Sequence, residues 1–598
     1  MVVRFLREAR ATTADAVSRA RALSPEDIAA LEARGNQCDN WAEVRISGNA
    51  TLDTIRNCRF EGSAILRLEN GPATLWNSRF RDVVIGAATV ENVGWVRRVR
   101  IEDGAFVSQV GEVSGCKNSR FNLGSFLQPG SEIGARKIFM LDGLTVADCA
   151  AMAALTSSEQ EQIATELMAS LAGLESDYAY VGAKVRLEHA IVVENCFIGP
   201  GAMVRGAVTL QSSILASTLN SPVHVGESSL VSDSVLDGGV GVHHGAQIHR
   251  SILLEYSGAE RAGQVSDSVL GPGSIMAKGE ITASLVGPFT GFHHQSLLIG
   301  ALWPEGRGNV GYGANVGSNH TGRKPDQELR AGEGTFFGLG CSIKFPANFE
   351  AAPYSLFASG VITAPQKITF PFALITTSHE DSAHGLNEIA PGWMWGENAY
   401  ALIRNAYKYA DRNHAQHHFV PEIAPPEGNV LTGTFLAADL FAPRIVAWIV
   451  TALKSFPQVA PIKSKGVYIE KEIAGLGKNF LRGSTLKKAR TAYENYLSFI
   501  LVRAALWSPG ISLAHSETYR PLLKLLKLES ERALDVDTLF ESFAVAVEKS
   551  LAKDAERGGK VFEDYADFHP DPASDPVCVR LRADLQKLNV AWQVVVGT

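Results

Sequence analysis

No stretch of this 598-residue chain is apolar over the length that a membrane-spanning helix needs. The most apolar segment, residues 435–456, is broken by two charged residues and a proline, which leaves nine uncharged residues from 445 to 453, whereas a span needs about 20. Residues 1–10 carry charges throughout and lack the apolar core of a secretory signal. We therefore expect no membrane span, and a buried helix within 435–456.

Basic blocks and paired cysteines are also missing. The formal net charge of -7 is spread along the chain, which argues against a nucleic-acid binder, because that class concentrates Lys and Arg on one surface. The seven cysteines form no CxxC motif. An odd, scattered set of cysteines predicts reduced thiols and a cytoplasmic location.

The chain contains instead a repeat between residues 181 and 363. In each copy a small residue is followed by two apolar residues, and taking the small residue as a marker gives intervals of 17, 21, 17, 17 and 16 residues. The markers are Cys196, Ser213, Ser234, Ser251, Ser268 and Ser284. This regularity indicates a repeat architecture.

Within each repeat an aliphatic residue tends to recur every six positions, as in Ile198, Val204 and Leu210. A helix would show a period of 3.6 and an alternating strand a period of 2. A period of six is typical of a β-helix, in which three hexapeptides form one triangular coil of roughly 18 residues and stacked coils share one core. We predict a β-solenoid, specifically a left-handed parallel β-helix of hexapeptide repeats. A second series of aliphatic positions supports it: Leu230, Leu236, Val242, Ile248 and Leu254.

Composition predicts five parts. Residues 1–42 are expected to form a helical cap, with a helix that starts at Ser24 and stops at Gly35. Three related phrases, at 57–60, 77–80 and 118–121, predict a first, looser β-helical section. A segment rich in Ala, Leu, Met, Glu and Gln predicts a helical insertion. The parts are 1–42, 43–146, 147–178, 179–370 for the main β-helix, and 371–598 for a C-terminal α-helical region.

The C-terminal region lacks the hexapeptide spacing, and Pro-rich linkers separate its apolar segments. Helices are expected near 396–412, 433–456, 484–507, 516–533, 536–553 and 573–590. Such a region either packs along the β-helix or contacts a neighbouring subunit.

Three phrases near the end of the β-helix carry candidate chemistry. They read GFHHQSLLIG at 291–300, VGYGANVGSNHTGRK at 310–324 and FGLGCSIKFPA at 337–347. Residues 291–363 resemble the acetyltransferase half of bifunctional N-acetylglucosamine-1-phosphate uridyltransferase, a hexapeptide-repeat transferase, in the order and spacing of these phrases. The whole chain more loosely resembles a bacterial family of hexapeptide-repeat proteins without an assigned function. No nucleotide-binding loop of the uridyltransferase half is found near the N-terminus.

The transferase resemblance implies transfer of an acyl group from acyl-coenzyme A, the co-substrate, to a sugar or nucleotide-sugar acceptor. His294, or its neighbour His293, matches the general base, a role that suits a side chain whose pKa lies near neutral. Asn319 matches the acceptor-binding Asn and Lys324 the sugar-phosphate-binding Lys, and the neighbouring His320 and Arg323 are assigned to the same substrate-binding site. His320 and Thr321 depart from the family's Tyr and Asp, which leaves the acceptor open. The family builds its sites between neighbouring β-helices, so the resemblance implies a homotrimer or a multiple of one.

Two other classes of function fit the same fold. His244 and His249 resemble the His-x4-His phrase with which γ-class carbonic anhydrases bind zinc, with His224 as a third candidate ligand, and His379 and His384 share that spacing. Histidines in β-helix turns are often purely structural, so no metal is favoured, and His414, His417 and His418 are assigned to a polar loop. The third class is a non-enzymatic scaffold whose helical region binds a partner.

Overall fold

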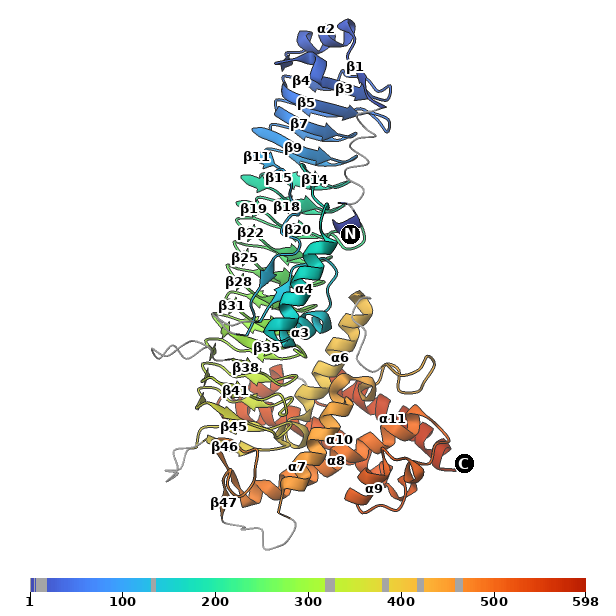
Figure 1. Cartoon of the computed structure of the whole chain (residues 1–598). Helices are drawn as coiled ribbons and strands as arrows, with labels where there is room; N and C mark the ends of the chain where they lie inside the picture. The colour runs from blue at the N-terminus through green and yellow to red at the C-terminus, as the bar shows by residue number, and fades with distance from the viewer. Residues whose placement is uncertain are drawn as a thin grey trace. The chain divides into compact units, whose positions relative to one another are not determined.

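The computed structural model describes residues 2–4, 6, 19–130, 136–317, 328–378, 387–416, 424–457, 466–569 and 571–597. Residues 44–375 form a β-solenoid of about 19 turns, which is followed by a helical region (Figure 1). The predicted fold class is therefore confirmed. The chain divides into two compact units, Met1–Leu329 and Arg330–Thr598.

In the described part of the first unit, a capped helix and two short strands precede the coils of the solenoid. Helix α2 (Pro25–Ala33) begins at Ser24, whose hydroxyl accepts the Asp27 N–H at 3.1 Å while the Asp27 carboxylate accepts the Ser24 N–H at 2.9 Å. Gly35, with a φ of 80°, ends the helix. The predicted cap thus contains strands as well as a helix: β1 (Arg21–Ala22), antiparallel to β3, and β2 (Gln37–Cys38), parallel to β5.

The first coils have long strands and lead to an excursion from the solenoid. In these coils β5, β7 and β9 pair in parallel. After β11 the chain leaves the solenoid, and it returns at β14, which pairs directly with β9. The stack is therefore continuous across the excursion. The strands are β3 (Val44–Ser47), β4 (Ile55–Arg56), β5 (Arg59–Arg67), β6 (Thr74–Trp76), β7 (Arg79–Ile85), β8 (Thr89–Glu91), β9 (Trp95–Ile101), β10 (Phe106–Ser108) and β11 (Glu112–Ser114).

From residue 179 to 316 each coil contributes one strand to each of three parallel faces. Face 1 comprises β15 (Arg186–Glu188), β18 (Met203–Arg205), β21 (His224–Val225), β24 (Gly241–Val242), β27 (Gly258–Glu260), β30 (Ile275–Ala277), β33 (Gly291–His293) and β36 (Asn309–Val310). Face 2 comprises β16 (Val192–Glu194), β19 (Thr209–Gln211), β22 (Leu230–Ser232), β25 (Gln247–His249), β28 (Gln264–Ser266), β31 (Glu280–Thr282), β34 (Leu297–Ile299) and β37 (Asn315–Val316). Face 3 comprises β14 (Ala179–Val181), β17 (Phe197–Ile198), β20 (Ile214–Leu215), β23 (Val235–Leu236), β26 (Ile252–Leu253), β29 (Val269–Leu270), β32 (Leu285–Val286) and β35 (Ala301–Trp303).

One inward residue per strand builds the core, and its spacing explains the repeat. Ile198, Val204 and Leu210 point inward and are six residues apart, but the next inward residue, Leu215, follows after five. A coil therefore takes 17 residues, because the corner between faces 2 and 3 is one residue shorter than the others. Because of this tight corner, the second predicted series is wrong at its two ends. Val231 and Leu253 point inward there, in place of Leu230 and Leu254.

The marker residues lie at this tight corner and are held by a ladder of hydrogen bonds. Ser251 Oγ donates to the His249 carbonyl at 2.7 Å and accepts the Ser268 N–H of the next coil at 3.2 Å. Ser234, Ser268 and Ser284 repeat both contacts. The residue before each marker takes a left-handed φ between 42° and 54°, which turns the chain. These corner residues are Asn195, Ser212, Asp233, Arg250, Asp267 and Ala283.

The excursion covers face 3 with apolar side chains. It contains the antiparallel pair β12 (Phe126–Leu127) and β13 (Ile138–Phe139) and the helices α3 (Val146–Ala154) and α4 (Ser157–Ser170). Outward residues of face 3, such as Phe197, Ile252 and Val269, are buried in one cluster with Phe121, Met140 and Cys149 of the excursion. Covering this stripe removes it from water, which is the main driving force for docking.

The phrase at 118–121 belongs to this covering segment and not to a coil, so that part of the prediction is wrong. Phe121 lies 6.0 Å from Phe197 of face 3, ring centroid to ring centroid. In the next coil of the solenoid, Val93 occupies the position equivalent to Ser78, and its N–H donates to Ser78 Oγ at 3.1 Å. Four residues that resemble the phrases at 57–60 and 77–80 could not show whether 118–121 forms a coil or packs against the outside of the solenoid.

The second unit contains the final coils, which end on an antiparallel strand. β46 (Asn387–Ala390) pairs antiparallel with β45 and parallel with β48, so it covers the edge of the last parallel strand. The other strands in order are β38 (Leu329–Arg330, at the boundary of the units), β39 (Phe336–Phe337), β40 (Ser342–Ile343), β41 (Ala347–Asn348), β42 (Leu356–Phe357), β43 (Ile362–Thr363), β44 (Gln366–Lys367), β45 (Leu374–Thr376), β47 (Val467–Tyr468) and β48 (Asn479–Arg482).

Helices of the second unit pack on the final coils around a buried aromatic cluster. Trp395 is 2% exposed and stacks on Phe543 at 4.8 Å, and the Tyr493 hydroxyl donates to the Pro371 carbonyl at 2.7 Å. Among the described residues, no helix combines the length and apolarity that crossing a membrane requires. The helices are α5 (Trp393–Gly396), α6 (Ala399–Gln416), α7 (Pro443–Ser455), α8 (Gly483–Trp507), α9 (Arg520–Leu525), α10 (Val536–Gly559) and α11 (Pro576–Gly597).

Candidate functional site

The predicted catalytic histidines lie at the end of a face 1 strand in the first unit. In β33 the side chain of Phe292 points inward and is 0% exposed, so the alternation of the strand directs Gly291 and His293 outward. His294 follows at the corner with a φ of 43°, and its carbonyl accepts the Gly313 N–H at 3.2 Å. The two imidazole centroids are 6.5 Å apart.

Gly291 leaves a hollow on face 1 that two polar side chains approach. A Cβ built on Gly291 would lie 3.1 Å from His293 Nε2 and 3.0 Å from Asn309 Oδ1. Asn309 comes from β36 and is directly paired with Gly291. A ring nitrogen and an amide oxygen therefore face the same space in front of a residue without a side chain. This geometry favours His293 over His294 as the base, because His294 is placed beyond the strand at the corner.

The predicted acceptor-binding residues lie outside the described residues. Asn319, His320, Arg323 and Lys324 fall between the end of face 2 at β37 and the start of β38. Their roles stay predictions.

A second copy of the histidine phrase occurs three coils earlier on the same face. Residues 241–244 read Gly-Val-His-His, and a Cβ on Gly241 would lie 2.9 Å from His243 Nε2, close to the value at Gly291. The ring of His243 lies 6.5 Å from that of His224 and 5.9 Å from that of His244. Burial lowers the pKa of His243, and the neighbouring imidazoles of His224 and His244 lower it further. His243 is therefore a neutral imidazole at neutral pH.

The structure does not bring the two proposed zinc ligands together. His244 lies at the corner before β25 and His249 at the last position of that strand, so the strand separates them. Within the described ranges no group of three or more His, Cys, Asp or Glu side chains is placed to hold a metal ion. His379, His384, His417 and His418 lie outside the described residues, as does the side chain of His414.

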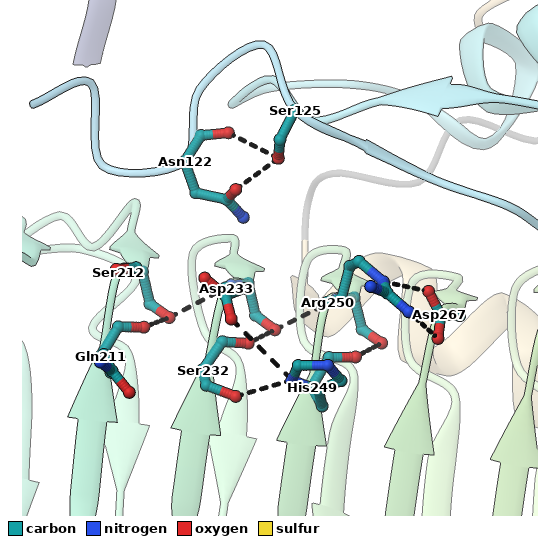
Figure 2. Close-up of polar contacts among 12 residues, drawn as sticks. Asn122, Ser125, Gln211, Ser212, Ser232, Asp233, His249, Arg250 and Asp267 are labelled. Atoms are coloured by element: carbon teal, nitrogen blue, oxygen red, sulfur yellow. Dashed lines mark hydrogen bonds and ion pairs between the residues drawn. The ribbon is translucent and has the colours of Figure 1, made fainter.

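His249 contacts a serine and an aspartate of the adjacent coil, yet the three do not form a catalytic triad. Ser232 Oγ lies 2.8 Å from His249 Nδ1, and Asp233 Oδ2 lies 4.0 Å from the same nitrogen (Figure 2). A triad needs the hydroxyl and the carboxylate on opposite ring nitrogens. The His249 and Asp233 side chains are also about half exposed, at 50% and 45%. This cluster is best explained as a solvated corner of the solenoid.

Two residues of face 1 were missed by the sequence analysis. His243 could have been found from the sequence, because the Gly-x-His-His phrase occurs twice, at 241–244 and 291–294. Asn309 carries no such signal, since its relation to Gly291 depends on strand register across one coil.

The fold defines a β-solenoid protein of the hexapeptide-repeat type, and its face 1 carries outward histidines. The family model described as Domain of unknown function (DUF4954) matches residues 20–326, just over half of the chain, and the chain belongs to this family. This match confirms the resemblance of the chain to a family without an assigned function. An uncharacterized protein of Treponema pallidum (strain Nichols) is 26% identical over 420 residues, which cover 66% of this chain and 57% of that protein. The chain thus spans just over half the length of this relative.

Proposed function

We propose that the chain is a cytoplasmic hexapeptide-repeat acyltransferase that moves an acyl group from acyl-coenzyme A to a sugar or nucleotide-sugar acceptor. The observation that carries this proposal is the convergence of His293 Nε2 and Asn309 Oδ1 on the hollow in front of Gly291. A base and a positioning amide on an open β-solenoid face are the groups that such a transfer needs.

In the proposed reaction His293 acts as general base. Its Nε2 accepts a proton from the acceptor amine or hydroxyl as the acceptor nitrogen or oxygen forms a bond to the thioester carbon. The carbon–sulfur bond then breaks, and the proton passes from His293 to the thiolate, which leaves as free coenzyme A. Asn309 Oδ1 accepts a hydrogen bond from the acceptor and orients it. Binding of the phosphate or sugar of the acceptor is assigned to Asn319, His320, Arg323 and Lys324.

A homotrimer belongs to this proposal, with face 1 turned toward a neighbouring subunit. Met203 and Ile275 occupy the same outward row of face 1 as Gly291 and are 44% and 40% exposed. Large apolar side chains on a flat, repeating surface favour association in a cyclic oligomer.

The test measures thiol release from acetyl-coenzyme A by the full-length chain with a panel of amino sugars and nucleotide-sugars. His293→Gln is expected to lower kcat by roughly 10²-fold or more and to leave coenzyme A binding unchanged. His189→Gln is the control, because His189 is an exposed corner histidine of another coil with a φ of 54°. Absence of both acetyl-coenzyme A binding and thiol release would reject the proposal in favour of a scaffold, and equal losses in the two variants would reject His293 as the base.

A further inference from the structure

The second unit contains a cavity of about 410 Å³ where α5, α8 and α10 meet. Its floor includes Trp395 and Phe543, whose rings are stacked at 4.8 Å. Small residues from all three helices line it, namely Gly396, Ala492 and Ala546. A lined volume of this size falls in the range of small-molecule sites, roughly 300–1,000 Å³.

One wall of the cavity is an aromatic side chain with an unused donor. Trp393 lines the cavity and is only half-buried. Within the described part of the chain its indole N–H has no hydrogen-bond partner, whereas the N–H of Trp395 donates to Asn495 Oδ1 at 2.8 Å. A ligand that covers Trp393 would bury this N–H, and buried indoles usually find a hydrogen-bond partner. The wall therefore offers a flat apolar surface and a free donor to a ligand.

The mouth of the cavity is positively charged. Lys487 and Lys488 line it from α8, and Glu397 lines it from the end of α5. Glu397 accepts Lys553 Nζ at 2.8 Å and Lys488 Nζ at 3.2 Å, and Lys553 is the main cause of its lowered pKa. Among the lining residues, Lys487 and Lys488 against the one Glu397 carboxylate leave an excess of one positive charge. Among the described residues Lys487 has no acidic partner.

We propose that this cavity binds a small planar aromatic acid. The aromatic ring packs between Trp393 and the floor formed by Trp395 and Phe543. The anionic group lies at the mouth, beside the exposed side chain of Lys487 on α8. An aliphatic acid would fit the charge but would not use the three aromatic walls. The site is separate from the histidines of face 1 and does not depend on the acyltransferase proposal.

The experiment titrates the full-length chain with 8-anilino-1-naphthalenesulfonate, an aromatic anion whose fluorescence rises in apolar sites. One saturable site is expected. Indole-3-acetate should displace the dye, whereas uncharged indole should displace it at least tenfold less well, because it lacks the group that pairs with Lys487. Equal displacement by both compounds would overturn the assignment of an acid.

Two variants with matched controls locate the binding. Ala546→Leu fills the cavity and should abolish saturable binding, whereas Val545→Leu, on the exposed side of α10, should not. Lys487→Glu should weaken dye binding by roughly tenfold, whereas Lys524→Glu, at an exposed lysine of α9 that does not line the cavity, should leave it unchanged. Lys487→Glu changes a surface residue, so its result stands even if Ala546→Leu fails to fold.

The same titration can overturn the proposal in two further ways. Exposed apolar residues elsewhere, such as Phe562 at 61% and Phe568 at 82%, could bind the dye instead. Saturable binding that survives both Ala546→Leu and Lys487→Glu but is lost in Phe562→Ala/Phe568→Ala would place the dye there. No saturable binding to the wild-type chain would also reject the site.

Discussion

The Tyr354 hydroxyl donates a hydrogen bond of 2.7 Å to Oε1 of Glu333, which joins two successive coils at the end of the solenoid. The other carboxylate oxygen of Glu333 pairs with Arg444 at the start of α7. The Glu333 side chain is 0% exposed, so both contacts are made away from solvent. One buried carboxylate thus connects the last coils to the helical region.

Replacing Arg444 should destabilise the second unit strongly. Arg444→Met removes a cation that pairs with the buried Glu333 carboxylate, and breaking a buried pair costs about 3–5 kcal/mol. Urea unfolding followed by tryptophan fluorescence measures the loss. Lys454→Met, an exposed lysine on the same helix, is the control and should change stability by less than about 0.5 kcal/mol. Adding Glu333→Gln to Arg444→Met should recover part of the loss; no recovery would contradict the role of the pair.

Removing one step of the serine ladder should weaken the solenoid locally. In Ser251→Ala the buried Ser268 N–H loses its acceptor, which costs about 1–3 kcal/mol. Hydrogen exchange should become faster at the amide of Ser268 and its neighbours in β29. Ser266→Ala changes an outward serine of β28 and should leave that exchange unchanged. If the Ser268 amide exchanges at the same rate in Ser251→Ala and Ser266→Ala, the ladder does not stabilise the tight corner.

The docking of the excursion on face 3 should depend on pH through Asp237. This carboxyl is 5% exposed, and burial raises its pKa to about 7, with Glu255 and Asp142 adding repulsion and the Gly143 N–H opposing the shift. Below about pH 4 the carboxyl is protonated in both the folded and unfolded states. Between pH 4 and 7 only the unfolded state gives up the proton, so stability falls as pH rises, by up to about 1.4 kcal/mol per unit.

Asp237→Asn removes this titration and is expected to raise stability at pH 7 relative to pH 5. Thermal unfolding at the two pH values, with hydrogen exchange of β13 and α3 as the local measure, tests it. Asp233→Asn serves as the control, because Asp233 lies at an exposed corner just before strand β23, whereas Asp237 follows that strand. A variant that keeps the pH dependence of the wild-type chain would contradict the assignment to Asp237.

Filling the hollow of face 1 should impair acyl transfer without unfolding the chain. In Gly291→Ala the new Cβ would lie 3.1 Å from His293 Nε2, closer than most such contacts, so the ring must turn away. A misplacement of about 1 Å can cost roughly 10²-fold in rate, so this smaller shift of the ring should lower the rate by roughly several-fold. Gly241→Ala is a matched control, because its Cβ would lie 2.9 Å from His243 Nε2 in the second copy of the phrase. Equal thiol release by Gly291→Ala and the wild-type chain would contradict the site.

The repeat could be predicted because each coil buries its inward residues only by stacking on its neighbours, so the pattern must recur along the chain. The spacing of Cys196, Ser213 and Ser234 followed directly from this requirement. Helix α2 was predictable for a local reason, since Ser24 and Asp27 complete the cap within four residues. Most helices of the C-terminal region were also predicted in place, although 516–533 contains only the short α9.

Local pattern could not assign residues whose role depends on contacts between distant segments. The phrase at 118–121 matches a coil, but Phe121 instead packs on Phe197 from outside. Leu230 fits the period of six, but the shorter corner makes Val231 the inward residue. In the candidate site the same limit applied to Asn309, which faces Gly291 only because adjacent coils are in register.

By itself the sequence determined the solenoid, its repeat and the helical region, because hydrophobic period and capping are properties of short segments. Tertiary structure alone decided which histidine faces a hollow, what covers face 3 and where the helices leave a cavity. Each of these depends on residues such as His293, Asn309 and Trp395 meeting partners from other strands or helices. Such meetings are governed by packing and register across the fold, and no local pattern encodes them.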